Sequence, residues 1–324
     1  MSDYQALLSK VVEDPASDAA RLACAEALEA SDPARAELIR VQLALPGRMD
    51  PARRLSLQHR ERALMNSHAR SWFKPLYAAS VFEPRYHRGF IEEVKLPEAR
   101  LATHGSDLFA REPISRLKVG TSDGKGLALA VEQPWFSQVR WLRLEGEGTD
   151  AAMQVLASAT RAGRLDSLVL TGAGDASVRE LVSSQALPAL RSVSLSSCAL
   201  TDASMEVLAK ATLPWERLYL SGSGLSDEGV AVLAKAKGLG ALQWLTLNRN
   251  EIGDDAAVAL AKSKGLVGLE RLELSRTEVS EEGALAFRSA KALPKLRRLE
   301  LLDIGFDADV LAPLIKRLGQ GLLF

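Results

Sequence analysis

The chain has 324 residues, 47% of them hydrophobic, which allows a large core and exceeds the roughly 100 to 200 residues usual for one compact domain. Lysine plus arginine equals aspartate plus glutamate at 41 each, so no long-range field favours nucleic acid, an anionic membrane surface or an acidic partner. The first residues lack a basic segment followed by an apolar run, and no stretch approaches about 18 uninterrupted apolar residues, which predicts a soluble cytoplasmic protein.

Residues 1–80 predict a small α-helical cap made of short helices. Apolar residues recur at helical spacing in YQALLSKVV, DAARLACAEALEA and ARAELIRVQLAL, and a charged helix is predicted near residues 51–67. Proline stands between these pieces or at their starts, as is usual at helix boundaries. The prolines are Pro15, Pro33, Pro46 and Pro51. We therefore expect these helices to pack as a bundle that caps the rest of the chain.

This segment resembles the bacterial repeat-companion domain. The positions that match the family are Leu7, Leu8, Asp14, Pro15, Asp18, Arg21, Leu22, Leu28, Asp32 to Gln42 and Tyr86 to Leu96. The family is known as an N-terminal partner of leucine-rich repeats in bacterial genomes, and its function is uncharacterised. The resemblance therefore implies a bacterial protein in which a repeat array follows the helical cap.

From residue 81 onward one frame, L-x-x-L-x-L, returns at regular intervals. Its second apolar residue recurs every 23 to 27 residues. The nine positions are Val94, Leu117, Leu142, Leu168, Val193, Leu218, Leu245, Leu272 and Leu299. A fixed period of about 20 to 29 residues with this frame is typical of leucine-rich repeats. Each frame predicts a short parallel strand, and strands stacked about 4.8 Å apart bury their leucines together.

The segment between two frames reads as a helix. Return segments such as DASMEVLAKATL and DEGVAVLAKAKGL begin with acidic residues, and Thr201 or Ser226 stands before them, as N-capping and the helix dipole favour. The expected fold class is therefore α/β, a leucine-rich-repeat horseshoe over residues 81–324. About nine parallel strands would line its concave side and helices its convex side, with the helical cap over residues 1–80.

The repeats are similar to the ribonuclease-inhibitor-like class of leucine-rich repeats, in which a polar slot and then an apolar residue follow each strand. The polar slot holds Cys198, Ser223, Asn250 and Thr277, and the apolar position holds Leu200, Leu225, Ile252 and Val279. The resemblance implies a ladder of polar side chains beneath the strands. Glu147, Ala173 and Ile304 depart from the slot, so we expect the ladder to be interrupted at both ends.

Three aromatic residues fall on the predicted concave face. Strand side chains alternate, so the residues on either side of each middle leucine point away from the core. Exposed Trp, Tyr and Arg are enriched at interface hot spots, where each contributes on the order of 2 kcal/mol or more. The predicted partner-binding residues are Trp141, Arg143, Arg217, Tyr219, Trp244, Arg249 and Arg271. The alternative is that arginines such as Arg143, Arg217 and Arg271 only stack on these rings through cation–π attraction.

Charge along this face predicts the kind of partner. The first third is basic, and the last strands alternate arginine with glutamate. The residues are Arg116, Lys118 and Arg143 in the first third, and Arg271, Glu273, Arg298 and Glu300 at the other end. Eight strand spacings of about 4.8 Å make a face nearly 40 Å long. We therefore expect a protein segment that is acidic at one end, and no small-molecule substrate, nucleic acid or membrane as a partner.

The leading hypothesis is a non-enzymatic scaffold for protein–protein interaction, and two alternatives remain open. Ribonuclease-inhibitor-like arrays include activators of small GTPases. In that class Arg217, Arg249 or Asn250 would act at a phosphate, since an arginine supplied in trans stabilises transferring phosphoryl charge. The second alternative is that the helical cap is the functional module and the array is only a spacer.

No pattern in the sequence predicts a catalytic centre, a metal or a cofactor. The histidines are scattered without metal-ligand spacing, and the glycine-rich pieces at 171–175 and 221–224 lack a Walker lysine and fall at strand-to-helix turns. Cys24 and Cys198 are far apart, which suits a reducing compartment better than a disulfide framework. The charged residues Arg21, Arg35, Glu37 and Arg40 predict ion pairs between the short helices, with a contact surface as the alternative.

Overall fold

The structure is a computed structural model that describes residues 3–324, with the backbone alone at Asp3 and Ala78. The chain divides by its contacts into two compact units. The first unit comprises residues 1–120 and 125–142, and the second unit comprises residues 121–124 and 143–324. The boundary expected near residue 80 follows a change in sequence pattern and stays a prediction.

The first unit begins with a helical bundle whose helix starts follow from their capping residues. The elements are α1 (Asp3–Glu13), α2 (Asp18–Leu28), α3 (Pro33–Ala44), α4 (Pro51–Phe73) and the 3-10 helix η1 (Lys74–Ala79). Ser17, Asp32 and Asp50 cap α2, α3 and α4, each accepting a backbone N–H in the first turn. Pro33 and Pro51 occupy the first helical position, as expected of helix punctuation.

Strands follow the bundle in the first unit. Its remaining elements are β1 (Phe82–His87), β2 (Phe90–Pro97), α5 (Glu98–Arg111), β3 (Arg116–Gly120), α6 (Lys125–Val131), the 3-10 helix η2 (Pro134–Gln138) and the first residues of β4 (Trp141–Glu145). β1 and β2 form an antiparallel hairpin, and β2 pairs in parallel with β3. The hairpin turn is Arg88–Gly89, where both residues have positive φ, as a two-residue turn of type I′ requires. The hairpin was not predicted, because only its second strand carries the leucine frame.

Two buried ion pairs tie the bundle to these strands. Arg21 lies 2.6 Å from Glu92 on β2, and Arg35 lies 2.9 Å from Glu112, which follows α5. Arg21 is 1% exposed and Arg35 is 5% exposed, so both guanidinium groups lie inside the unit. The expectation that these two arginines pair with other short helices is wrong, because their partners lie on β2 and after α5; it is confirmed for Glu37 and Arg40. The pairs of Glu37 with Arg60 and of Arg40 with Glu29 lie at the surface.

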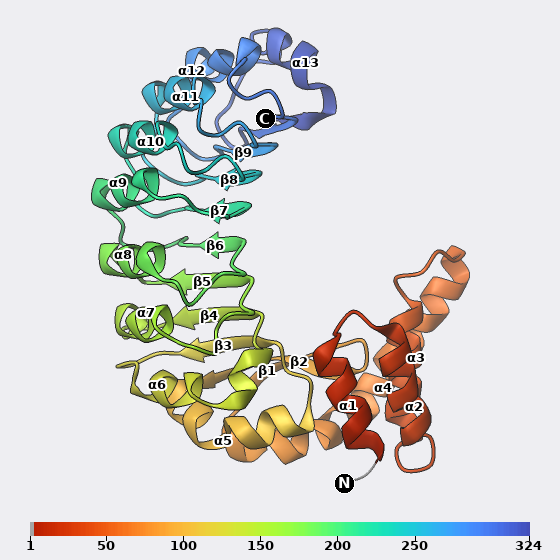
Figure 1. Cartoon of the computed structure of the whole chain (residues 1–324). Helices are drawn as coiled ribbons and strands as arrows, with labels where there is room; N and C mark the ends of the chain where they lie inside the picture. The colour runs from red at the N-terminus through yellow and green to blue at the C-terminus, as the bar shows by residue number, and fades with distance from the viewer. Residues whose placement is uncertain (1–2) are drawn as a thin grey trace. The chain divides into compact units, whose positions relative to one another are not determined.

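The second unit is a row of strand–helix repeats. Its strands are the end of β4, β5 (Ser167–Thr171), β6 (Ser192–Ser194), β7 (Arg217–Tyr219), β8 (Trp244–Thr246), β9 (Arg271–Glu273), β10 (Arg298–Glu300) and β11 (Leu322–Leu323). Its helices are α7 (Thr149–Ala157), α8 (Asp175–Ser183), α9 (Asp202–Lys210), α10 (Asp227–Ala234), α11 (Asp254–Ala261), α12 (Glu281–Leu285), η3 (Ala286–Ser289), α13 (Ala312–Leu318) and η4 (Gly319–Gly321). Figure 1 shows strands β5 to β9 along the concave side of this unit and helices α7 to α11 along the convex side.

The predicted register of the repeats is confirmed. Each of the nine frame positions lies in a strand, and equivalent positions pair in parallel, as with Leu218, Leu245 and Leu272 on β7 to β9. These three leucines have no exposed surface, so one residue per repeat fills the same layer of the core. β1 and β11 are strands outside the nine predicted ones. The α/β leucine-rich-repeat horseshoe is therefore the fold of the repeats.

A ladder of aspartates joins each helix start to the next. The Oδ1 atom of Asp227 on α10 accepts the backbone N–H of Gly253 at 2.7 Å and of Ala256 at 3.1 Å, at the start of α11. Asp254 accepts the Ser280 N–H at 2.7 Å in the following repeat. Burial alone would raise the pKa of Asp175, but hydrogen bonds from Ser204 and Thr201 hold it below its usual value. The acidic residues were predicted at helix starts because they favour the helix dipole. They also join neighbouring repeats through these hydrogen bonds.

Polar side chains fill the slot after the strands, as the resemblance of the repeats to the ribonuclease-inhibitor-like class implied. Asn250 is 5% exposed; its Nδ2 donates to the carbonyls of Leu220 and Leu247 at 2.9 and 2.8 Å. Its Oδ1 accepts the N–H groups of Ser223 at 3.0 Å and Leu225 at 3.2 Å. The Ser223 hydroxyl and the Cys198 thiol likewise donate to carbonyls of the preceding repeat. These side chains satisfy backbone groups that the short strands leave unpaired.

The turns after β4 to β10 each place one residue at positive φ. The residue four positions after the middle leucine has positive φ at Gly146, Gly172, Ser197, Gly222, Arg249, Arg276 and Asp303. An L residue with a side chain pays about 1 to 2 kcal/mol for this region, whereas glycine adopts it freely. Arg249 therefore stores strain in its backbone.

Replacing Arg249 with glycine is expected to raise the free energy of unfolding by about 0.5 to 1 kcal/mol, because relief of the strain exceeds the entropy cost of glycine. Urea unfolding measures the change. The matched control is Gly222→Ala, which introduces a side chain at the same position of the preceding repeat and is expected to lower stability by a similar amount. A loss of stability on Arg249→Gly would contradict the argument.

The C-terminal tail covers the last frame strand. β11 pairs in parallel with β10, and the Leu301 N–H donates to the Leu323 carbonyl at 2.7 Å. The sequence left open whether this tail or a second subunit would meet the strand near Leu301.

Within residues 3–324, no helix has the length and apolarity that a membrane crossing demands.

Candidate partner-binding surface

The concave side of the second unit carries a cluster of aromatic and charged side chains on β7, β8 and β9. Tyr219, Trp244 and Arg271 are half-buried, while the leucines that alternate with them are fully buried. Register places Arg217 beside Trp244, and Trp244 beside Arg271. The prediction that Trp244 lies on the strand face rather than in the core is confirmed.

Trp244 is held on three sides. Its ring centroid lies 5.3 Å from that of Tyr219, at an interplanar angle of 64°. The guanidinium carbon of Arg271 lies 4.0 Å from the Trp244 ring centroid, which is close cation–π contact. The indole Nε1 donates to the Glu273 carboxylate at 2.9 Å. The ring is therefore fixed before any partner arrives.

Glu273 organises this cluster, which we call the Trp244 cluster: Tyr219, Trp244, Asn248, Arg271 and Glu273. One carboxylate oxygen lies 2.7 Å from Arg271 Nε and accepts the Trp244 indole, while the other accepts the Asn248 Nδ2 at 3.0 Å. Asn248 in turn accepts the Ser275 N–H at 2.7 Å. Glu273 is only 7% exposed, because these longer side chains cover it.

Neither Asn248 nor the central place of Glu273 was predicted from the sequence. The sequence predicts Glu273 only as one charge in an alternating row, whereas its carboxylate accepts the Trp244 indole N–H and forms an ion pair with Arg271. Asn248 lies outside the L-x-x-L-x-L frame, just after the strand, so strand alternation did not assign it to a face. The repeat pattern assigns the polar slot to Asn250, the second asparagine in LNRN, which directly precedes Glu251.

Tyr219 keeps its proton at neutral pH. Burial raises the pKa of its phenol, and the nearby Arg217 guanidinium only partly opposes this rise. The hydroxyl is therefore both a donor and an acceptor for a partner. Beside it in register, the Thr246 hydroxyl is buried and has no hydrogen-bond partner in the described part of the chain.

The other predicted site residues lie apart from the Trp244 cluster. Trp141 belongs to the first unit, where the Arg116 guanidinium lies 4.4 Å from its ring centroid. Arg143 belongs to the second unit and pairs with Glu145 at 2.7 Å. Arg249 stands at the left-handed turn after β8 and is exposed. Of the seven predicted residues, the structure brings Tyr219, Trp244 and Arg271 into direct contact, with Arg217 beside Trp244 in register.

Stacking of arginine on the rings, the alternative weighed for this face, occurs at two places. Arg271 stacks on Trp244 and Arg116 stacks on Trp141. Arg143 instead pairs with a carboxylate, and Arg217 is exposed. The stacks leave both indoles half-buried, so stacking and partner binding are compatible.

The residues named for a phosphate-directed role are not arranged for it. The Asn250 side chain lies in the core beneath the strands with both of its amide atoms bonded to backbone. It therefore cannot reach a bound phosphate, and its assignment as a candidate there is wrong. Arg217 and Arg249 are exposed, but Arg217 lies in β7 and Arg249 in the turn after β8.

Within residues 3–324, no group of three or more histidine, cysteine and carboxylate side chains is placed to hold a metal ion. Burial raises the pKa of the Cys24 thiol to about 11, and it also raises that of Cys198, so both remain protonated at neutral pH. A thiolate is the nucleophilic form of cysteine, and neither buried thiol supplies it.

Comparison with known proteins identifies the repeats. The family described as Leucine Rich repeat matches residues 242–261, which hold β8 and α11. No curated protein matches the chain. The solved structure of an internalin from Listeria monocytogenes is similar at 16% sequence identity and a TM-score of 0.30, covering 69% of this chain and 85% of that chain. At these values the likeness supports nothing further, and the assignment of the repeats rests on the matched family and the strand register.

Proposed function

We propose that this leucine-rich-repeat protein is a non-enzymatic scaffold of the bacterial cytoplasm that binds a protein partner on the concave face of its repeats. Leucine-rich-repeat folds typically serve as protein-interaction scaffolds. The observation that carries the proposal is the Trp244 cluster, in which an indole, a phenol and a guanidinium stand together on the strand face.

Preorganisation favours such a role. Binding costs free energy whenever a side chain must be immobilised, about 0.5 to 1.5 kcal/mol for each flexible one. Here Trp244 is already fixed by Arg271 and by the Glu273 carboxylate. Little of this immobilisation cost is therefore left to reduce the affinity for a partner that covers the ring. Tyr, Trp and Arg are also the residue types that dominate interface hot spots.

Charge at the cluster favours an acidic segment of the partner. The carboxylates of Glu273 and Glu300 are both engaged by arginines, at 2.7 Å from Arg271 and from Arg298 respectively. Arg217 on β7 is exposed and forms no ion pair in the described part of the chain. A partner carboxylate beside the Tyr219 hydroxyl would therefore find a cation that is still unpaired.

The test is binding of the natural partner, identified by affinity purification with mass spectrometry and then measured with purified components. Trp244→Ala is expected to weaken binding by about 30-fold, equivalent to about 2 kcal/mol. Tyr219→Ala should weaken it less, because Trp244 keeps its contacts with Arg271 and Glu273.

Two further variants complete this test. Tyr77→Ala removes an exposed aromatic ring in the first unit and should leave affinity unchanged. Trp141→Ala tests the predicted role of Trp141 in the same way; weaker binding would add the ring on which Arg116 stacks to the binding surface. Unaltered affinity in the Tyr219→Ala/Trp244→Ala double variant, with an unchanged melting curve, would refute the concave face as the binding surface.

A further inference from the structure

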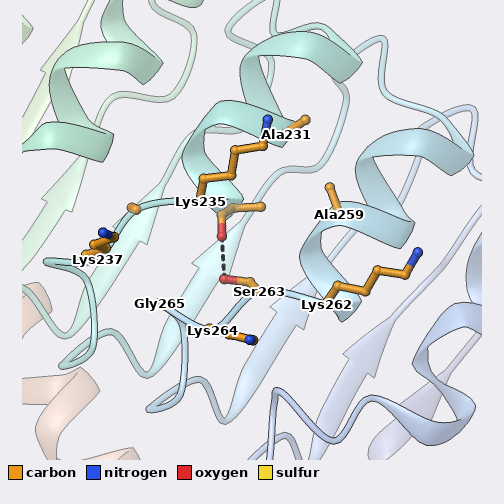
Figure 2. Close-up of a pocket in the computed structure, with 10 residues that line it drawn as sticks. Ala231, Lys235, Lys237, Ala259, Lys262, Ser263, Lys264 and Gly265 are labelled. Carbon is orange, nitrogen blue, oxygen red and sulfur yellow. Dashed lines mark hydrogen bonds between the residues drawn. The ribbon is translucent and has the colours of Figure 1, made fainter.

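A groove lies on the convex side of the second unit, between the ends of two helices. It runs between the C-terminal ends of α10 and α11 and encloses about 540 Å³. Its walls are largely methyl groups, from Ala231, Ala234, Ala236 and Ala259, and Figure 2 shows the segment around Ser263 and Gly265 crossing its base. This groove has no part in the concave face described above.

Two copies of one short motif build the groove. The chain reads AKAKG at residues 234–238 and AKSKG at residues 261–265, one repeat later. Because the repeats stack in register, the two motifs lie side by side and bring four lysines to one rim. They are Lys235, Lys237, Lys262 and Lys264, and all four are exposed and line the groove.

The base of the groove is rigid. The Ser263 hydroxyl donates to the Ala234 carbonyl at 2.6 Å, the contact drawn as a dashed line in Figure 2. A Cβ atom at Gly265 would lie 1.5 Å from the Ala236 carbonyl oxygen, so only glycine permits this close approach between repeats. The base of the groove is therefore fixed by direct contacts between neighbouring repeats.

The rim is strongly positive. Within residues 3–324, the ammonium groups of the four lysines make no ion pair or hydrogen bond, whereas Lys210, one repeat before Lys235, pairs with Glu206 at 3.2 Å. Each helix C-terminus carries roughly half a negative charge, so α10 and α11 offset about one of the four positive charges. The lining residues thus include four lysines and no acidic side chain, which favours an anion with an apolar part.

Size decides between a small molecule and a protein partner. Ligand pockets enclose roughly 300 to 1,000 Å³ and are lined mostly by apolar groups with a few polar ones, a description that the groove fits. A stable protein interface instead covers about 800 Å² on each partner, far more than one such groove offers. We propose that this groove binds an aliphatic carboxylate, with the chain on the alanine floor and the carboxylate among the lysines.

Isothermal titration with decanoate, below its micellar concentration, tests the proposal on the full chain. We expect saturable binding of one decanoate, no detectable binding of acetate, and none of decyltrimethylammonium, which has the same chain with the opposite charge. Each methylene removed from the carboxylate should weaken binding by about fourfold at most. Equal affinity for decanoate and the cationic probe would show a general apolar contact and overturn the proposal.

Variants locate the binding. Ala259→Phe fills the groove and should abolish decanoate binding, and the double change Lys262→Gln with Lys264→Gln should weaken it about tenfold or more. The matched control is Lys291→Gln, one repeat beyond Lys264 and outside the groove, which should leave affinity unchanged. Melting curves establish that each variant folds, and Ala231→Phe serves as a second filling variant. Decanoate binding that is absent, or that persists in the filled variants, refutes the site.

Discussion

Arg35→Met is expected to lower the free energy of unfolding by about 3 to 5 kcal/mol, one of the two largest losses that we expect of single substitutions in this chain. The substitution leaves the Glu112 carboxylate buried without its counter-ion. The Arg35 Nη2 atom now lies 2.9 Å from both carboxylate oxygens, and its guanidinium stacks on Trp72, Tyr86 and Phe90. Urea unfolding followed by a probe in the first unit measures the loss.

The loss in Arg35→Met should grow with pH. Burial raises the pKa of Glu112 in the native chain, and Arg35 opposes that rise. Without Arg35 the folded-state pKa moves further above the ordinary value of 4.5. A group with a raised folded-state pKa stabilises the fold below its unfolded pKa and loses that contribution as pH rises. The free energy of unfolding of the variant is therefore expected to be closer to that of the native chain at pH 5 than at pH 8.

Glu112→Gln combined with Arg35→Met is the control for this prediction. Glutamine keeps an oxygen for the Ile91 N–H, which Glu112 accepts at 3.0 Å, and it carries no charge. Removing both charges should recover at least half of the lost stability, because a buried pair contributes little beyond what its own desolvation costs. A double variant as unstable as Arg35→Met at pH 8 would show that stacking on the aromatic rings, not charge, is what Arg35 supplies.

Asn250→Ala is the second large effect, with an expected loss of about 3 kcal/mol. The amide serves four backbone groups of two repeats, and each buried group left without a partner costs about 1 to 3 kcal/mol, offset in part by relaxation. Unfolding in urea, with hydrogen exchange of the Ser223 and Leu225 amides as a local probe, measures it. Exchange should quicken most at these two amides.

Thr277→Ala is the matched control in the polar slot. Its hydroxyl donates one hydrogen bond, to the Leu274 carbonyl within its own repeat at 2.7 Å. We expect a loss of about 1 kcal/mol, in keeping with a single hydrogen bond. Equal losses in the two variants would mean that the bonds between repeats add nothing to stability.

The repeats were predictable from the sequence because their signal is periodic. A strand side chain faces the core or the surface by its parity, so once the leucine frame is aligned, the face of Trp244 and Tyr219 follows without coordinates. The polar slot was predictable in the same way, since Cys198, Ser223 and Asn250 hold one position in successive repeats. Capping residues such as Ser17 and Asp50 marked helix starts because they act on backbone only two or three residues away.

The candidate site was only partly predictable. Alternation placed Tyr219, Trp244 and Arg271 on one face, but it gave no means to tell which side chains would touch. Glu273 became the centre of the cluster because an indole N–H, an amide and a guanidinium from three positions converge on its oxygens. Asn250, one candidate for contact with a phosphate, instead forms hydrogen bonds to backbone groups with both atoms of its amide.

Sequence alone determined the period of the array, the parity of its strands and the local starts of its helices, because each depends on interactions between residues close in the chain or repeated at a fixed interval. Tertiary structure decided the rest: that Arg35 meets Glu112, that β11 covers β10, and that lysines of two repeats ring one groove. These contacts join residues whose separation in the chain carries no periodic signal or whose side-chain directions depend on packing, so only the folded chain brings them together.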